Sequence, residues 1–140
     1  MIKDFILQNK SGILLCGVSC IGKTHFSHFL KAHDLYHLAK EIKSFHAINS
    51  DVQLNTKLKS IWSLKKGVIV LGAPWFIWKK RIEHRKQYFK KNRKKDNIWF
   101  KRSYVKCIDK LDELNIPYIL IDNRNNYPIL DKANFIKMLT

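Results

Sequence analysis

The residues best suited to chemistry form a short segment near the start of the chain, in which two glycines frame a loop that ends in Lys-Thr. Segment 17–24 reads Gly-Val-Ser-Cys-Ile-Gly-Lys-Thr and matches the pattern Gly-x-x-x-x-Gly-Lys-[Ser/Thr] at every position. Glycines let such a loop curl so that successive backbone N–H groups point at phosphate oxygens, and the helix that follows adds its positive end. The lysine reaches the β- and γ-phosphates of a nucleotide, and the threonine hydroxyl binds Mg²⁺. The candidate nucleotide-binding residues are Gly17, Val18, Ser19, Cys20, Ile21, Gly22, Lys23 and Thr24, of which Lys23 is also a candidate catalytic residue and Thr24 a candidate metal ligand.

Positive charge is concentrated in one part of the chain. The 140 residues include 27 Lys and Arg against 11 Asp and Glu, so the formal net charge is +16. Thirteen basic and two acidic residues fall between Lys79 and Lys106, so these 28 residues carry a net charge of +11. A local excess of this kind favours a polyanionic partner such as nucleic acid, whereas a basic composition without such a partner is the alternative explanation. The candidate nucleic-acid-binding residues are Lys90, Lys91, Arg93, Lys94 and Lys95.

The elements that must position these residues alternate between strand and helix. Short apolar runs predict strands at 12–16, 45–49, 67–71 and 117–121. Helical spacing of apolar residues predicts helices at 22–33, 52–64, from Pro74 onward, at 98–114 and at 133–139. Such alternation predicts an α/β fold with a short parallel sheet of about four to five strands and helices on its faces.

Length and composition narrow the class of protein further. One domain spanning 1–140 is expected, because cores divide only beyond roughly 250 residues. No apolar run approaches the roughly 18 residues of a membrane span, and charges interrupt the apolar stretches at the N-terminus, so neither a membrane partner nor a cleavable leader is expected. Three cysteines without disulfide spacing suit a reducing compartment. The composition therefore predicts a cytoplasmic protein, and it leaves the oligomeric state open.

Given this loop, nearly the whole chain resembles the small P-loop kinases of the nucleotide-kinase type. Segment 71–74, Leu-Gly-Ala-Pro, is similar to that family's strand ending in Leu-x-x-Pro, after which two arginines four residues apart face the transferred phosphates. The resemblance implies a P-loop three-layer sandwich with ATP and Mg²⁺ as cofactors, Arg81 and Arg85 as catalytic residues, and the basic segment 86–97 as a lid. A solvated helix face is the other explanation of the two arginines.

Two further elements of the resemblance concern the ends of strands. Segment 48–51, Ile-Asn-Ser-Asp, resembles the carboxylate-bearing strand of thymidylate-kinase-like proteins, which implies that Asp51 is catalytic, either by organising Mg²⁺ or by accepting the proton of an attacking hydroxyl. No arginine follows Asp51, which departs from that pattern, and Asp51 could equally cap the next helix. Asn123 and Arg124 follow the last predicted strand, where the family contacts the adenine base, although an Asx turn explains them as well.

The phosphate acceptor is inferred from the absence of a substrate-clamping region in the sequence. Only segment 34–44 separates the first helix from the next strand, whereas nucleoside monophosphate kinases carry an extra strand and a helical substrate clamp there. An open acceptor side beside a basic lid suits a polymer, and this combination most resembles small phage-type DNA kinases, which phosphorylate a hydroxymethylated pyrimidine within DNA. The sequence therefore predicts an ATP-dependent kinase acting on a hydroxyl of nucleic acid, with DNA as the partner. The alternatives are a (deoxy)nucleoside monophosphate kinase and a nucleotide-binding switch or NTPase.

Overall fold

A computed structural model describes residues 2–9, 13–18, 21–33, 35, 42–45, 67–84 and 97–140. Helices and strands alternate along these ranges, as the sequence predicts. In chain order they are α1 (Ile2–Gln8), β1 (Ile13–Cys16), α2 (Lys23–Ala32), β2 (Ile42–Phe45), β3 (Gly67–Gly72), α4 (Trp75–Glu83), α6 (Asn97–Glu113), β4 (Tyr118–Asp122), β5 (Ile129–Leu130) and α7 (Lys132–Leu139).

The five strands form one mixed sheet in the order β2-β1-β3-β4-β5. The pairs β1–β2, β1–β3 and β3–β4 are parallel, whereas β5 runs antiparallel to β4. The prediction of a parallel sheet is therefore wrong at this edge. Only residues 123–128 separate β4 from β5, and a parallel return needs a crossover of about a dozen residues or more, so the chain can only turn back beside β4.

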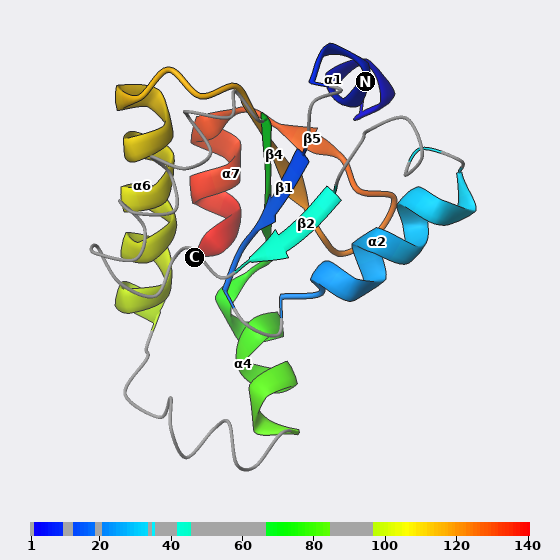
Figure 1. Cartoon of the computed structure of the whole chain (residues 1–140). Coiled ribbons are helices and arrows are strands. Elements are labelled where there is room, and N and C mark those ends of the chain that lie inside the picture. Colours follow the sequence, from blue (N-terminus) through cyan, green and yellow to red (C-terminus); the bar gives the residue numbers. More distant parts are fainter. Residues whose placement is uncertain are drawn as a thin grey trace.

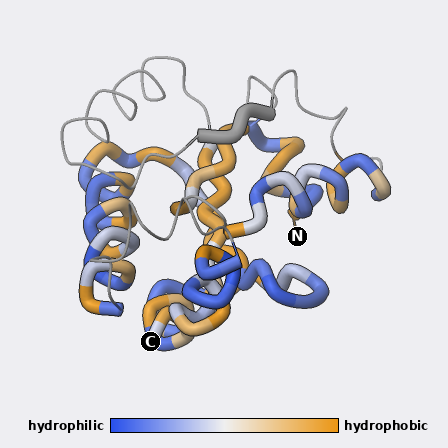
Figure 2. The backbone as a smooth tube through the Cα atoms, turned by 90° about the horizontal axis from the view of Figure 1, so that it is seen from below, coloured by the Kyte–Doolittle hydropathy of each residue, from blue (hydrophilic) through white to orange (hydrophobic). Residues whose placement is uncertain are grey.

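Helices cover both sides of the sheet. Figure 1 shows α6 and α7 on one side and α2 on the other, with α4 below the ends of the strands. The hydropathy tube in Figure 2 is orange through the middle of the molecule and mostly blue along the outer turns. Every residue of β1 and β3 is buried, which is why these strands appear in the sequence as continuous apolar runs.

A column of aromatic rings joins three of the helices over the sheet. Trp78 of α4 stacks on Phe100 of α6 with ring centroids 5.0 Å apart. Tyr104 of α6 contacts Phe100 and, edge to face, Phe135 of α7 at 5.1 and 5.7 Å. All four rings are fully buried, so they fix α4, α6 and α7 relative to one another.

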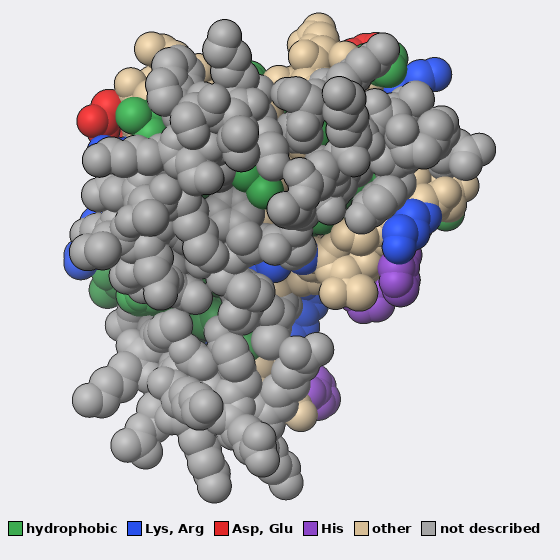
Figure 3. All heavy atoms as spheres, viewed as in Figure 1, with side chains coloured by type: hydrophobic (Ala, Val, Ile, Leu, Met, Phe, Trp, Pro, Cys, Tyr) green, Lys and Arg blue, Asp and Glu red, His purple; other side chains and the backbone are tan. Residues whose placement is uncertain are grey.

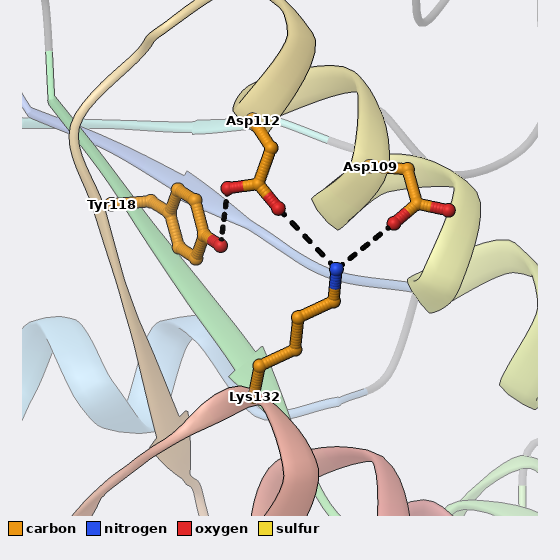
Figure 4. Close-up of polar contacts among 4 residues, drawn as sticks. All are labelled: Asp109, Asp112, Tyr118 and Lys132. Atoms are coloured by element: carbon orange, nitrogen blue, oxygen red, sulfur yellow. Dashed lines mark hydrogen bonds and ion pairs between the residues drawn. The ribbon is translucent and has the colours of Figure 1, made fainter.

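A small polar cluster at the surface connects α6 with α7 and β4 (Figure 4). Lys132 at the start of α7 donates to Asp109 at 3.1 Å and to Asp112 at 3.3 Å, and the Tyr118 hydroxyl of β4 donates to Asp112 at 2.7 Å. Hydrogen bonds to the two carboxylates raise the pKa of Lys132. Burial, followed by the bond to Asp112, raises the pKa of Tyr118. These exposed contacts connect two helices to the sheet and add little to stability individually.

Two differences from the predicted elements concern the edges of the fold. The sequence analysis did not predict α1, which buries Phe5 and Ile6 and packs against the start of β3. Strand β2 lies at 42–45, whereas a strand was predicted at 45–49, and residues 46–49 are outside the described ranges. The predicted helix at 52–64 and the predicted lid at 86–97, except for Asn97 at the start of α6, also lie outside them. No helix among the described residues is long and apolar enough to cross a membrane.

Candidate functional site

The predicted phosphate-binding segment lies at the point where the connections of the sheet change direction. From β1 the chain leaves toward β2, and from β3 it leaves toward β4 on the opposite side, so the carboxyl ends of β1 and β3 lie between the two connections. In open α/β sheets, ligands bind at such a switch point. Segment 17–24 begins directly after β1 and ends in the first turn of α2, so the strand order alone places it there.

Both glycines of the loop are required by their surroundings. Gly22 has φ +104°, a left-handed conformation that glycine adopts without strain. A Cβ at Gly22 would lie 2.5 Å from the Asn123 amide nitrogen. A Cβ at Gly17 would lie 2.8 Å from the Ile21 side chain and 3.0 Å from the Leu71 carbonyl oxygen. At Gly17 and Gly22 the described backbone therefore leaves no room for a larger residue.

The two motif residues that begin α2 have different environments. Lys23 is 7% exposed, and its Nζ donates to the carbonyl oxygens of Gly17 and Val18 at 3.1 and 3.0 Å. The ammonium group is thereby held against the backbone of the loop, where an incoming phosphate oxygen would compete with these carbonyls. Thr24 is exposed at the N-terminal end of α2, whose first turn carries no acidic residue. The positive end of this helix is therefore free of a competing carboxylate from its own first turn.

Two side chains from distant elements converge on one carbonyl of the loop. Arg81 of α4 donates from Nη1 to the Ile21 carbonyl oxygen at 2.6 Å. Asn123, directly after β4, donates from Nδ2 to the same oxygen at 2.8 Å. The structure thus brings Arg81 and Asn123 to the loop, as a shared site requires, although each side chain contacts the loop backbone itself.

Tyr104 of α6 is a further residue of the site, and it was not among the candidate residues predicted from the sequence. It is fully buried, and its hydroxyl donates to the Leu71 carbonyl at 2.6 Å and lies 3.5 Å from the Val18 backbone nitrogen, which donates to it. Burial raises the pKa of Tyr104 well above its usual value, so the phenol remains protonated. The sequence held one signal for this residue: its hydroxyl lies on the apolar face of a predicted helix. A buried hydroxyl needs a polar partner, so such a tyrosine is expected to bond to a neighbouring element.

Arg124 is placed differently from Asn123. Its guanidinium forms a two-pronged pair with Asp122, with Nη2 2.7 Å and Nε 2.9 Å from the carboxylate oxygens. The hydrogen bond to Asp122 raises the pKa of Arg124. The Arg124 side chain is 42% exposed, so it borders the solvent beyond the end of β4. The structure does not test its predicted role in contacting the base.

The remaining predicted site residues lie outside the described ranges and keep the status of predictions. They are Ser19, Cys20, Asp51, Arg85, Lys90, Lys91, Arg93, Lys94 and Lys95.

The described residues of the site include donors for phosphate oxygens but no set of metal ligands. Within the described ranges, no three His, Cys, Asp or Glu side chains are grouped closely enough to hold a metal ion. The exposed Thr24 hydroxyl is the described group that would bind Mg²⁺ carried by a nucleotide, because a hard cation prefers oxygen ligands. Figure 3 shows Lys, Arg and histidine side chains on the surface over α2 and the end of α4.

Comparisons with known proteins add no family to this description. No family model matches the chain, and no match was found among curated proteins or among solved structures.

Proposed function

We propose that this chain is a Mg²⁺- and ATP-dependent kinase that transfers the γ-phosphate to a hydroxyl group of nucleic acid. One observation carries the proposal: Lys23, Arg81 and Asn123, from three separate parts of the chain, all contact the backbone of the motif loop at the carboxyl ends of the parallel strands. Such a loop, preceded by a buried strand and followed by a helix, has the structural context in which its sequence pattern binds phosphates.

The fold is compatible with the finer assignment to a P-loop three-layer sandwich. The motif follows a central parallel strand and opens a helix on one side of the sheet, while α6 and α7 lie on the other side (Figure 1). The carboxyl ends of β1 and β3 lie beside the loop, which is where open α/β sheets bind ligands.

The proposed chemistry assigns the described residues to charge neutralisation and positioning. A bond forms between the acceptor oxygen and the γ-phosphorus while the bond to the β,γ-bridging oxygen breaks, and the acceptor proton passes to a base. Lys23 and Arg81 neutralise the negative charge on the phosphate oxygens during the transfer. Thr24 would bind the Mg²⁺ that accompanies ATP. Asp51 as the base or metal organiser and Arg85 as a second arginine complete the proposal.

The nucleic-acid acceptor is proposed from charge. Segment 79–106 carries a net charge of +11, far more than the phosphates of one nucleotide require. Arg81 belongs to this segment and also contacts the loop, so the charged segment begins beside the loop. A polyanionic acceptor held along the segment would reach the transferred phosphate from the side of α4.

A label-transfer screen tests the proposal. The chain is incubated with Mg²⁺ and ATP labelled at the γ-phosphate, with nucleosides, nucleotides, DNA with 5′-hydroxyl ends and hydroxymethylated DNA as separate acceptors. We expect label in DNA, and we expect Lys23→Ala to reduce the rate by at least about a thousandfold, because charge neutralisation dominates phosphoryl transfer. Lys137→Ala, an exposed lysine of α7, is the matched control.

Each other outcome of the screen has a definite meaning. Label in free nucleoside monophosphates alone would replace the proposal with a small-molecule kinase, and label in inorganic phosphate alone would replace it with an NTPase or switch. Equal transfer by the parent and by Lys23→Ala would remove the loop from the reaction.

A further inference from the structure

We infer that Asn123 is a positioning residue of the phosphate-binding loop, which acts with Arg81 by fixing the orientation of the Ile21–Gly22 peptide. The two donors reach the Ile21 carbonyl oxygen from different elements, Asn123 at 2.8 Å and Arg81 at 2.6 Å. Asn123 is itself fixed in place, because it is only 4% exposed and its backbone N–H donates to the Gly72 carbonyl at 2.8 Å.

The geometry of the peptide bond converts this contact into an effect on the ligand site. None of the described peptide bonds is cis, and in a trans peptide the C=O and N–H groups point in opposite directions. Two donors that hold the Ile21 carbonyl on their own side therefore turn the Gly22 N–H to the other side. A phosphate-binding loop requires successive N–H groups that point toward the ligand, away from the side chains that hold the carbonyl.

The contact has two requirements: the side chain at position 123 must donate a hydrogen bond to the Ile21 carbonyl, and position 22 must carry no side chain. The Asn123 amide nitrogen faces the Ile21 carbonyl, whereas its Oδ1 is buried without a hydrogen-bond partner. An unpartnered buried oxygen is costly, so the favourable part of this amide is the donor that contacts the loop. Gly22 leaves the space in which this donor lies, because a Cβ there would be 2.5 Å from Nδ2 and 3.2 Å from Arg81 Nη1.

This role differs from a contact with the nucleotide base, which was the sequence-based prediction for Asn123. One of the two N–H donors of the Asn123 amide binds the loop, and the inference concerns this contact, while the contact with the base stays a prediction. The inference deepens the proposed function, since it concerns the same site, and it assigns Asn123 to the orientation of the loop.

A thermodynamic cycle on triphosphate binding tests the inference. Asn123→Leu keeps a similar size but cannot donate, and it is combined with Arg81→Ala. Affinities of the full chain for inorganic triphosphate and for ATP are measured by calorimetry. The matched controls are Asn125→Leu, an exposed asparagine in the same loop, and Lys137→Ala, an exposed lysine of α7.

We expect Asn123→Leu to weaken triphosphate binding about tenfold, while the controls change it less than about twofold. The double variant should lose more than the product of the two single losses, because each donor still holds the carbonyl when the other is absent. Any direct contact of Arg81 with phosphate cancels in this cycle. Asn123→Leu binding as tightly as Asn125→Leu, or losses that simply multiply, would overturn the inference. If Asn123→Leu does not fold, Asn123→Ala takes its place in the same cycle.

Hydrogen exchange separates this inference from the proposed function. If the parent chain binds neither triphosphate nor ATP, the proposed function fails, and the contact is tested without a ligand. Amides of segment 21–26 should then exchange faster in the double variant than in the parent, since the anchored peptide has lost both donors. Unchanged exchange in that segment would show that Asn123 and Arg81 do not hold the loop.

Discussion

Backbone carbonyl groups of single residues organise the loop as much as its N–H groups do. The carbonyls of Gly17 and Val18 hold the Lys23 ammonium group, and the carbonyl of Ile21 holds Arg81 and Asn123. A phosphate that binds Lys23 must therefore compete with two existing hydrogen bonds. The affinity for an anion is the difference between the new and the old contacts, which makes it sensitive to single substitutions.

Gly22→Ala tests the conformation of the loop at this scale. An alanine at φ +104° costs about 1–2 kcal/mol, and its Cβ would also displace the Asn123 amide. We expect lower stability to urea and weaker triphosphate binding, each measured against the parent. Ser27→Ala, in the middle of α2, is the control, and it should change neither quantity by more than about 0.5 kcal/mol. Unchanged triphosphate binding in Gly22→Ala would mean that the loop does not need this conformation.

The elements differ in how far the sequence predicts them. The central strands β1, β3 and β4 are confirmed, because strands with both faces covered leave an apolar run that a glycine or proline bounds. The two-residue strand β5 is too short to leave any pattern. Helix α1 interleaves charged residues with the buried Phe5 and Ile6, so its packing against β3 is decided by tertiary contacts.

The partners of the loop could not be predicted for a different reason. The motif itself is local in sequence, whereas Asn123 is 102 positions from Ile21 and Tyr104 is 86 positions from Val18. Their approach depends on the strand order and on the packing of α6, and neither leaves a local pattern. A resemblance predicted a role for Arg81 at the phosphates, whereas the contact that the structure shows is with a carbonyl that carries no sequence signature.

The link between α6 and the loop predicts unequal effects of two Tyr→Phe substitutions. Tyr104→Phe removes the buried hydroxyl that bonds the Leu71 carbonyl, so we expect a loss of about 1–2 kcal/mol of unfolding free energy in urea. Tyr118→Phe removes an exposed hydrogen bond to Asp112, and it should cost less than about 0.5 kcal/mol. Equal losses in the two variants would contradict the anchoring role of Tyr104.

The same hydroxyl predicts a dependence of stability on alkaline pH. Burial raises the pKa of Tyr104 in the folded chain, so above about pH 10 the unfolded chain loses this proton while the folded chain keeps it. The contribution of this group to the free energy of unfolding is fully present below pH 10, and it falls by up to about 1.4 kcal/mol per pH unit above pH 10. Urea unfolding at pH 8 and pH 11 should show a smaller decrease for Tyr104→Phe than for the parent. The same decrease in both would show that Tyr104 does not contribute.

At the scale of the whole molecule, charge determines the expected partner. If segment 79–106 neutralises DNA phosphates, the logarithm of affinity should fall with the logarithm of salt by about 0.7 to 0.9 per contact. Replacing Lys90, Lys91, Lys94 and Lys95 by glutamine should weaken DNA binding and flatten this slope, with ATP binding little changed.

The matched control removes the same charge elsewhere, by replacing Lys3, Lys31, Lys110 and Lys137 with glutamine. Equal slopes for the two quadruple variants would mean that total charge, and not the basic segment, attracts DNA. Absence of DNA binding at low salt in the parent would exclude a nucleic-acid acceptor.

The contact between α7 and β3 has a consequence for the order in which the protein is made. A Cβ at Gly72 would lie 2.5 Å from the Phe135 ring, so the helix that comes after every strand closes directly over the central one. While the ribosome has yet to release residues 132–139, β3 lacks the cover that α7 gives it at Gly72, and a nascent chain with an exposed apolar strand is prone to associate with other chains. The rate at which residues 73–139 are translated therefore sets how long this part of β3 waits for its cover.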